Sequence, residues 1–197
     1  MLKLNISSRQ KQIIVGKLLG DGHLETTNDI SYRLKFEHSY AQKNYVDWLY
    51  EELKELASGQ PKIKLQMVNG KVYQKYWFNS PYSPSLRFYA TQFYRGKIKI
   101  VPKLIKRWLT RLTLAVWFMD DGSIKSKECR GRLINTQSFK DEDLKRLQNA
   151  LKEKFQINTI LRKQKEGKQI YIPAEEHDKL VKIIGADIIP SMHYKLD

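Results

Sequence analysis

Two segments that lie one hundred residues apart share the same pattern. IVGKLLGDG (14–22) and LAVWFMDDG (114–122) are both largely apolar until they end in Asp-Gly. Apolar residues at helical spacing predict a helix in each segment, and a glycine is typical of a helix end. Strands, a helix, a hairpin and a last helix are then expected after each segment, in the same order. This recurrence indicates a duplicated unit.

Alternation and periodicity place the other elements. The run SYRLKFEHS puts Leu34, Phe36 and His38 on one side and charged residues on the other, which is typical of a strand with one buried face. Asn69-Gly70 predicts a hairpin turn. Further strands are expected at 61–67, 71–79, 131–139, 158–164 and 168–173, and further helices at 41–56, 85–94, 140–155 and 174–185. The pattern predicts an α+β chain of two similar halves.

The chain is strongly basic. It has 36 lysine and arginine residues against 21 aspartate and glutamate residues, a formal net charge of +15. Such a surface favours a polyanionic partner, and nucleic acid is the expected one. The other interpretation is a lysine-rich surface without such a partner. A single cysteine, Cys129, and the absence of a long apolar run indicate a reducing, intracellular compartment and no membrane span.

The two Asp-Gly ends concentrate negative charge. A helix C-terminus already bears partial negative charge and free carbonyls, and Asp21 and Asp121 each add a carboxylate. Two such ends brought together would repel each other unless a cation lay between them. Carboxylate and carbonyl oxygens suit hard divalent cations such as Mg²⁺, and a metal beside a basic surface points to phosphodiester hydrolysis. One copy alone would be interpreted as an ordinary turn, but two equivalent copies favour a metal site.

The two segments resemble the signature motifs of a known family. IVGKLLGDG and LAVWFMDDG are similar to the motifs of the LAGLIDADG homing endonucleases, and NTQSF (135–139) and YKL (194–196) extend the likeness to the monomeric, two-motif, intron-encoded type. The resemblance spans residues 13–196. It implies tandem, pseudo-two-fold αββαββα repeats whose two antiparallel sheets form a DNA-binding saddle. The first motif departs from the family consensus at Lys17 and Leu19.

The resemblance also implies which residues hold metal. Asp21 and Asp121 would be the catalytic metal ligands, and the carbonyls of Gly20 and Asp120 would be further ligands. The expected ion is Mg²⁺, with Mn²⁺ or Ca²⁺ able to substitute for binding. Asp120 is expected to act through its backbone, and its side chain has no assigned task.

A lysine near each metal completes the expected catalytic set. Lys99 and Lys195 occupy the positions that match the family's lysines. Each would orient the attacking water or stabilise charge on the scissile phosphate. The other interpretation of these two lysines is a phosphate contact or plain solvation.

Strand alternation nominates the residues that would contact DNA. If the apolar face of each sheet packs on helices, the opposite face meets DNA. Arginine and glutamine can pair with base edges, whereas most of the lysines would touch phosphate. A solvated surface role is an equal alternative for any one of them. The candidates are Arg33, Lys35, Lys62, Lys64, Gln66, Lys71, Tyr73, Lys75, Arg130, Arg132, Arg162, Gln164 and Lys168.

These features predict a monomeric, Mg²⁺-dependent, site-specific endonuclease that cuts both strands of a long double-stranded DNA target. Its expected layout is a half-domain at 1–98, a connector at 99–110 and a half-domain at 111–197. The alternative is a non-cleaving binder of the same fold, an intron maturase or a transcription factor, so host intron RNA is a second candidate partner. The expected compartment is a bacterial or archaeal cytoplasm, or an organelle such as the mitochondrion.

Overall fold

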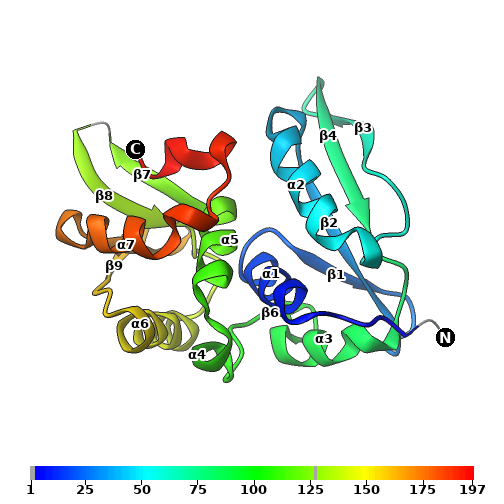
Figure 1. Ribbon diagram of the computed structural model, residues 1–197, viewed down its shortest axis with the longest axis horizontal. Coiled ribbons are helices and arrows are strands. Elements are labelled where there is room, and N and C mark those ends of the chain that lie inside the picture. The colour runs from blue at the N-terminus through cyan, green and yellow to red at the C-terminus, as the bar shows by residue number, and fades with distance from the viewer. Residues whose placement is uncertain (1–2, 127) are drawn as a thin grey trace. The chain divides into compact units, whose positions relative to one another are not determined.

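A computed structural model describes residues 3–126 and 128–197, which fall into two compact units. The first unit comprises residues 3–11 and Asp21–Ala90, and the second comprises Gln12–Gly20 and Thr91–Asp197 (Figure 1). Helix α1 (Ser8–Leu19) begins in the first unit and continues in the second. Because the units divide the chain at other residues, the expected half-domain boundaries stay a prediction.

Helix α1 begins at a capping box, six residues before the motif, and ends directly before the motif's Gly20, as the sequence predicts. The Ser7 hydroxyl accepts a hydrogen bond from the Gln10 amide at 3.2 Å, and the Ser7 amide donates to the Gln10 side chain at 3.0 Å. This reciprocal capping box satisfies donors that a helix N-terminus leaves free. The helix ends at Leu19, directly before Gly20.

The first unit is a four-stranded antiparallel sheet covered by one long helix. Its strand order is β1-β2-β4-β3. Helix α2 packs on β2 and β4 (Figure 1), where Phe36 and Phe78 lie 4.8 Å apart between ring centroids. Leu34, Phe36 and His38 are buried, as the alternation predicts. The elements are β1 (His23–Thr26), β2 (Tyr32–Ser39), α2 (Lys43–Leu53), β3 (Lys62–Val68) and β4 (Lys71–Asn79), while α3 (Arg87–Phe93) begins in this unit and ends in the second.

The hairpin of β3 and β4 extends beyond this helix. Ile63, Leu65 and Met67 are 54%, 67% and 74% exposed, so the expected packing of this apolar face on a helix is wrong. The reason is that α2 contacts β2 and β4, while β3 lies at the edge of the sheet.

The second unit repeats the same topology. Its antiparallel strand order is β7-β8-β10-β9, equivalent to the order in the first unit. Strand β8 ends at Ile134, earlier than predicted, because the Thr136 side chain turns to bond the main chain of Lys168 and Ile170. The elements are α5 (Arg111–Asp121), β7 (Gly122–Ser126), β8 (Cys129–Ile134), α6 (Asp141–Phe155), β9 (Ile160–Gln164), β10 (Gly167–Ile172) and α7 (His177–Ile184).

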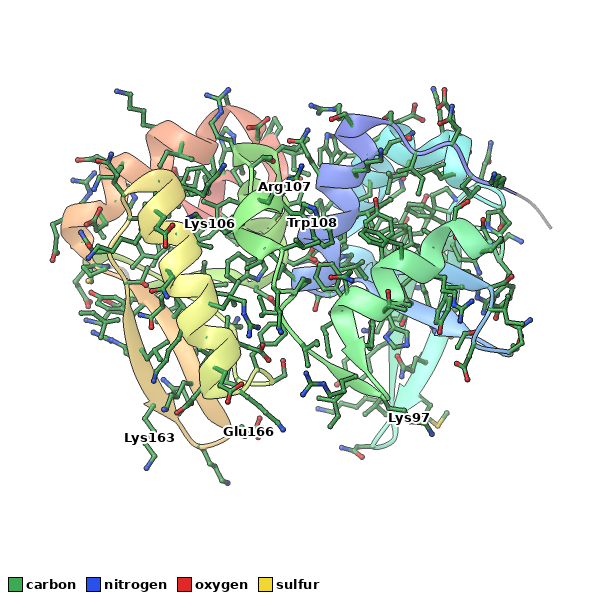
Figure 2. All side chains as sticks on the ribbon, turned by 90° about the horizontal axis from the view of Figure 1, so that it is seen from below. Lys97, Lys106, Arg107, Trp108, Lys163 and Glu166 are labelled. Atoms are coloured by element: carbon green, nitrogen blue, oxygen red, sulfur yellow. The ribbon has the colours of Figure 1, made fainter. Side chains whose placement is uncertain are left out.

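The segment expected to be a connector is packed into the second unit. It holds the end of the small hairpin β5 (Tyr94–Arg95) and β6 (Ile98–Lys99), followed by the short helix α4 (Ile105–Trp108). The Trp108 ring at the end of α4 stacks on Phe93 with centroids 6.2 Å apart (Figure 2). Ile105 and Leu109 are fully buried, so this segment contributes to the core.

The α+β fold with two equivalent antiparallel sheets is confirmed. Strands β1 and β7, which directly follow the two Asp-Gly ends, escaped the residue patterns because they are too short to show alternation. None of the helices in the described residues is long and apolar enough to cross a membrane.

Candidate active site

The ends of α1 and α5 pack closely within the second unit. A side chain on Gly16 would lie 2.7 Å from the Thr113 carbonyl oxygen and from the Val116 Cβ. Only glycine at position 16 allows the backbones of α1 and α5 to approach this closely, with Gly16 packed directly against Val116. The equivalent ends at Gly20 and Asp120 are thereby brought together.

The carbonyls at these two ends each accept a hydrogen bond from a lysine. Lys99 of β6 donates from Nζ to the Gly20 carbonyl at 2.6 Å. Lys195 donates to the Asp120 carbonyl at 3.1 Å and also to the Met119 carbonyl. A cation at a helix C-terminus offsets the negative end of its dipole. The two predicted lysines therefore reach equivalent carbonyls, although they arrive from different elements.

The motif aspartates follow these carbonyls and have different surroundings. In the second unit, the Asp121 carboxylate accepts a hydrogen bond from the Trp117 indole at 3.2 Å. In the first unit, the Asp21 carboxylate lies 3.7 Å from His38 Nδ1, and its side chain is 52% exposed. His38 is itself buried against the Tyr45 ring, so its position is fixed by the core.

The donor set at each end fits a hard divalent cation. Gly20 with Asp21, and Asp120 with Asp121, each offer one main-chain carbonyl and one carboxylate. Both kinds of oxygen are ligands that Mg²⁺ and Ca²⁺ accept. In both motifs the carbonyl already lies next to a lysine ammonium, so each position accommodates positive charge.

The side chain of Asp120 has a partner that the sequence reading did not assign. Its Oδ1 forms an ion pair with Lys17 Nζ at 2.7 Å, and both side chains are 0% exposed. A buried lysine in an apolar motif almost always has a counter-charge. The departure from the family consensus at Lys17 was the signal that could have revealed this pair.

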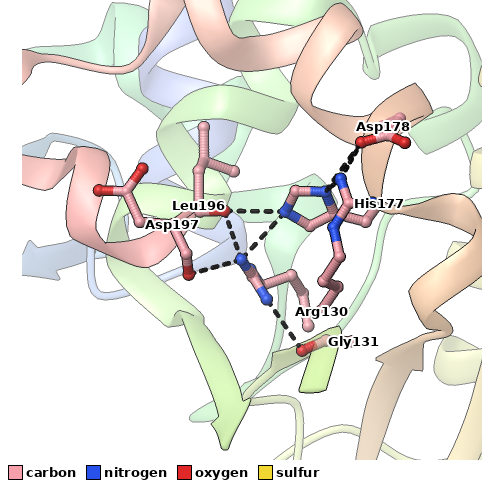
Figure 3. A network of polar contacts seen from close by, with 7 residues as sticks. Arg130, Gly131, His177, Asp178, Leu196 and Asp197 are labelled. Carbon is pink, nitrogen blue, oxygen red and sulfur yellow. Dashed lines mark hydrogen bonds and ion pairs between the residues drawn. The ribbon is translucent and has the colours of Figure 1, made fainter. Parts of the chain in front are cut away.

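The segment that carries Lys195 is anchored by Arg132 of β8. The Arg132 guanidinium donates to the Leu196 carbonyl and, at 2.7 Å, to the Asp197 carbonyl (Figure 3). His177 of α7 completes the anchor, because its Nε2 lies 2.8 Å from the Leu196 carbonyl. Arg132 is 1% exposed, so the expectation that it contacts DNA is wrong.

Arg130 lies on the same side of β8 as Arg132. It forms an ion pair with Asp178 and lies 2.9 Å from His177 Nδ1, both on α7. Arg132 contacts the same His177 ring at 3.0 Å, so both arginines lie on the side of the sheet that faces α7. The expectation that Arg130 lies on the open face of the sheet is therefore wrong as well.

The comparison with known families follows the two motifs. The sequence pattern of the LAGLIDADG DNA endonuclease family matches residues 11–180. The chain belongs to this family. The solved structure of the homing endonuclease I-WcaI bound to its DNA recognition sequence has the same fold as this LAGLIDADG chain. The TM-score is 0.93 at 24% identity, over 99% of this chain and 88% of that one.

Two relatives carry different names, a maturase and an endonuclease. Cytochrome b mRNA maturase bI2 of Saccharomyces cerevisiae is 35% identical over 209 residues, 99% of this chain and 48% of the maturase. The LAGLIDADG chain thus spans about half of that relative. DNA endonuclease I-ChuI of Chlamydomonas applanata is 29% identical over 211 residues, 98% of this chain and 96% of the endonuclease.

The open face of the first sheet, opposite α2, carries all the candidates predicted for it. Strand pairing sets Arg33 opposite Glu25, Lys64 opposite Lys75, and Gln66 opposite Tyr73. Residues paired in this way share a face, and so do residues two apart on a strand. The eight candidates on this face are Arg33, Lys35, Lys62, Lys64, Gln66, Lys71, Tyr73 and Lys75.

The open face of the second sheet keeps only two of its five candidates. Arg162 is paired with Gln169, and its guanidinium lies 3.7 Å from the centroid of the Tyr171 ring on the same face. Gln164 shares this face. Lys168 instead reaches Asp141 of α6 at 2.6 Å, so its expected place on the open face is wrong. The sequence reading missed Tyr171 because the run KQIYIP is apolar on both sides.

Proposed function

We propose that this LAGLIDADG chain is a site-specific homing endonuclease that hydrolyses both strands of a double-stranded DNA target with Mg²⁺. The observation that carries the proposal is the repeat-equivalent arrangement at the motif ends. There, Lys99 and Lys195 donate to the carbonyls of Gly20 and Asp120, and each carbonyl precedes a motif aspartate. A feature built twice from different elements favours a shared chemical task over chance.

The metal would be held by the carboxylates of Asp21 and Asp121 and the carbonyls of Gly20 and Asp120. When bound, Mg²⁺ supplies Lewis-acid stabilisation of phosphate charge and an acidified water. The lysines' part is to present positive charge at the scissile phosphate and to orient the nucleophilic water by hydrogen bonding. Mn²⁺ or Ca²⁺ is expected to substitute for Mg²⁺ in binding.

Double-stranded DNA is the proposed partner. The I-WcaI structure contains its DNA recognition sequence, and the net charge of +15 of this chain suits a phosphate backbone. The proposed contacts are the eight candidates of the first open face, together with Arg162 and Gln164 of the second. We further propose that the protein acts as a monomer, inside a cell or organelle, with halves at 1–98 and 111–197 joined by 99–110.

The test compares Asp21→Asn and Asp121→Asn with a matched control, Asp29→Asn. Asp29 lies in an exposed turn at a φ of 55°, which asparagine tolerates. A target site is first selected from a randomised plasmid library by cleavage. Both motif variants should bind this target with near wild-type affinity and fail to linearise it, while the control cuts normally. Wild-type cutting by both motif variants, or cutting in a chelator, would overturn the proposal.

A maturase role is the second candidate. It is favoured by the likeness to cytochrome b mRNA maturase bI2 at 35% identity. Splicing of the host intron RNA with and without the protein tests it. The two activities are separable, because the aspartate variants should leave any splicing activity intact.

A further inference from the structure

The ion pair of Lys17 and Asp120 links the two motif helices inside the core of the second unit. Lys17 projects from α1 and Asp120 from the end of α5, and their charged atoms lie 2.7 Å apart. Both side chains are fully buried, whereas the Asp120 residue as a whole is partly accessible. The exposure of Asp120 therefore comes from its main chain, on the side where its carbonyl lies.

Stability alone is a weak reason for this pair. Moving two charges out of water offsets most of their mutual attraction, and apolar side chains of similar shape are often at least as stable in the same place. A buried charge pair is better explained where it fixes one arrangement among several.

The pair occurs in only one of the two possible orientations. Lys17 is equivalent to Trp117 in the second motif, and Asp120 is equivalent to Gly20 in the first. A side chain on Gly20 would lie 2.4 Å from Asp120 Oδ2, so the carboxylate fills the space that the glycine leaves. Trp117, in contrast, donates to Asp121 of its own helix. The ion pair of Lys17 and Asp120 therefore has no counterpart at the equivalent positions, Trp117 and Gly20.

Both the side chain and the main-chain carbonyl of Asp120 have a lysine partner. Its side chain is tied to α1 through Lys17, and its carbonyl accepts from Lys195 at 3.1 Å. The α-carbon of Gly20 packs against the Asp120 side chain, and the Gly20 carbonyl accepts from Lys99 at 2.6 Å. The Asp120 carboxylate is thus in contact with Lys17 of α1 and with Gly20, which directly follows that helix.

We propose that Lys17 and Asp120 form a positioning pair that holds the Gly20 and Asp120 carbonyls at the spacing needed for cleavage. This inference rests on the proposed endonuclease function. The Asp120 side chain would then have a positioning role, separate from the metal-binding role proposed for the Asp120 carbonyl. Both side chains are fully buried and paired with each other, so the role of the pair is positioning rather than catalytic.

The test replaces the pair with apolar side chains of similar shape, Lys17→Met together with Asp120→Leu. The thermal midpoint should be equal to or above that of the wild type, and the dissociation constant for target DNA should stay within about twofold. The single-turnover cleavage rate should fall by about a hundredfold, because a displacement of about 1 Å has this effect. Ca²⁺ titrated into the protein–DNA complex in a calorimeter should bind more weakly.

The matched control removes another ion pair of the same unit, Lys179 with Glu176 at 2.6 Å, as Lys179→Met and Glu176→Gln. Its cleavage rate and Ca²⁺ affinity should be unchanged. If the apolar pair fails to fold, Asp120→Asn keeps the shape and one oxygen for Lys17 and takes its place in the same assays.

A stable apolar variant that cuts at the wild-type rate would overturn the positioning role. A loss of cleavage that is fully accounted for by weaker DNA binding would overturn it as well. Failure of the wild type itself to cleave any selected site would instead reject the proposed function, so the two failures are distinguishable.

Discussion

The open face of the first sheet is ionic, whereas the open face of the second is built from amides, an aromatic ring and few charges. On the first face, Arg33 pairs with Glu25 at 2.6 Å, and Lys64 pairs with Glu37 at 2.7 Å. On the second face, Arg162 stacks on Tyr171. Among its strand residues that the structure describes, no acid lies on this second face.

If both open faces contact DNA, as proposed, this difference predicts that the two sheets do so in different ways. Cations that already pair with carboxylates are held in fixed positions, and the carboxylates can accept hydrogen bonds from base amino groups. A stacked arginine next to glutamine presents a rigid donor fork, and Lys125 adds a further cation 5.7 Å from the centroid of the same ring. Two arginines of β8 lie on the opposite side, where Arg130 pairs with Asp178 of α7 and Arg132 anchors the segment of Lys195.

The largest expected effect is a loss of stability when one arginine in each sheet, Arg132 or Arg33, is replaced by methionine. Arg132→Met should lower the free energy of unfolding by about 3 kcal/mol or more, since it leaves the buried carbonyl of Leu196 without this charged donor. Arg33→Met removes a surface ion pair and should lower it by less than about 1 kcal/mol. Urea denaturation of both variants measures the contrast. Equal losses would show that the two arginines are not on opposite sides of their sheets.

The next effect concerns sequence discrimination by the second face. Arg162→Ala should reduce discrimination against a mismatched base pair by about 1–3 kcal/mol, because a stacked guanidinium is the strongest base reader on this face. Lys168→Ala is the control, since Lys168 reaches Asp141 on the helix side. Competition binding with single-substitution targets measures both. If only the Lys168→Ala control lost discrimination, Lys168 rather than Arg162 would lie on the face that contacts DNA.

A smaller effect is expected for phosphate contacts of the first face. Lys62→Ala and Lys71→Ala should each reduce the slope of log affinity against log salt by about 0.9, the value for one neutralised phosphate. Lys163 of β9 alternates with Arg162 and Gln164, and Figure 2 shows it near the end of its sheet. Lys163→Ala should leave the slope unchanged. Salt titrations of target binding that show no difference among the three variants would contradict the first face as a phosphate surface.

Much of the placement of residues on the two sheet faces could be predicted from local sequence pattern. The places where that prediction failed have physical causes. Alternation placed the first open face correctly because the apolar side of β2 is clearly apolar. Alternation failed in β8. There Arg130 and Arg132 lie on the helix side, and Ile134 is the one apolar residue of β8 on that side, so the side looks polar in the sequence. The family resemblance nominated Lys99 and Lys195, but the pairing of Lys17 with Asp120 is a contact between segments about one hundred residues apart, which no local pattern encodes.

The smallest expected effect is a difference in acid sensitivity that only the first face should produce. Burial raises the pKa of Glu25, but the hydrogen bond and charge of Arg33 outweigh it and lower the pKa below its ordinary value; Lys64 and Lys35 do the same for Glu37. A carboxyl with a lowered pKa stabilises the fold above about pH 4.5 and loses that contribution as the pH falls further.

Glu25→Gln with Glu37→Gln should therefore lose about 0.5 kcal/mol of unfolding free energy at pH 7, since the pairs are partly exposed. Its stability should also decline less steeply than that of the wild type between about pH 5 and pH 3, where the wild-type carboxylates take up protons on unfolding. Denaturation at a series of pH values measures both. Parallel curves for the two proteins would mean that the carboxylates of the first face are solvated rather than paired, and the contrast between the two faces would then lie in composition alone.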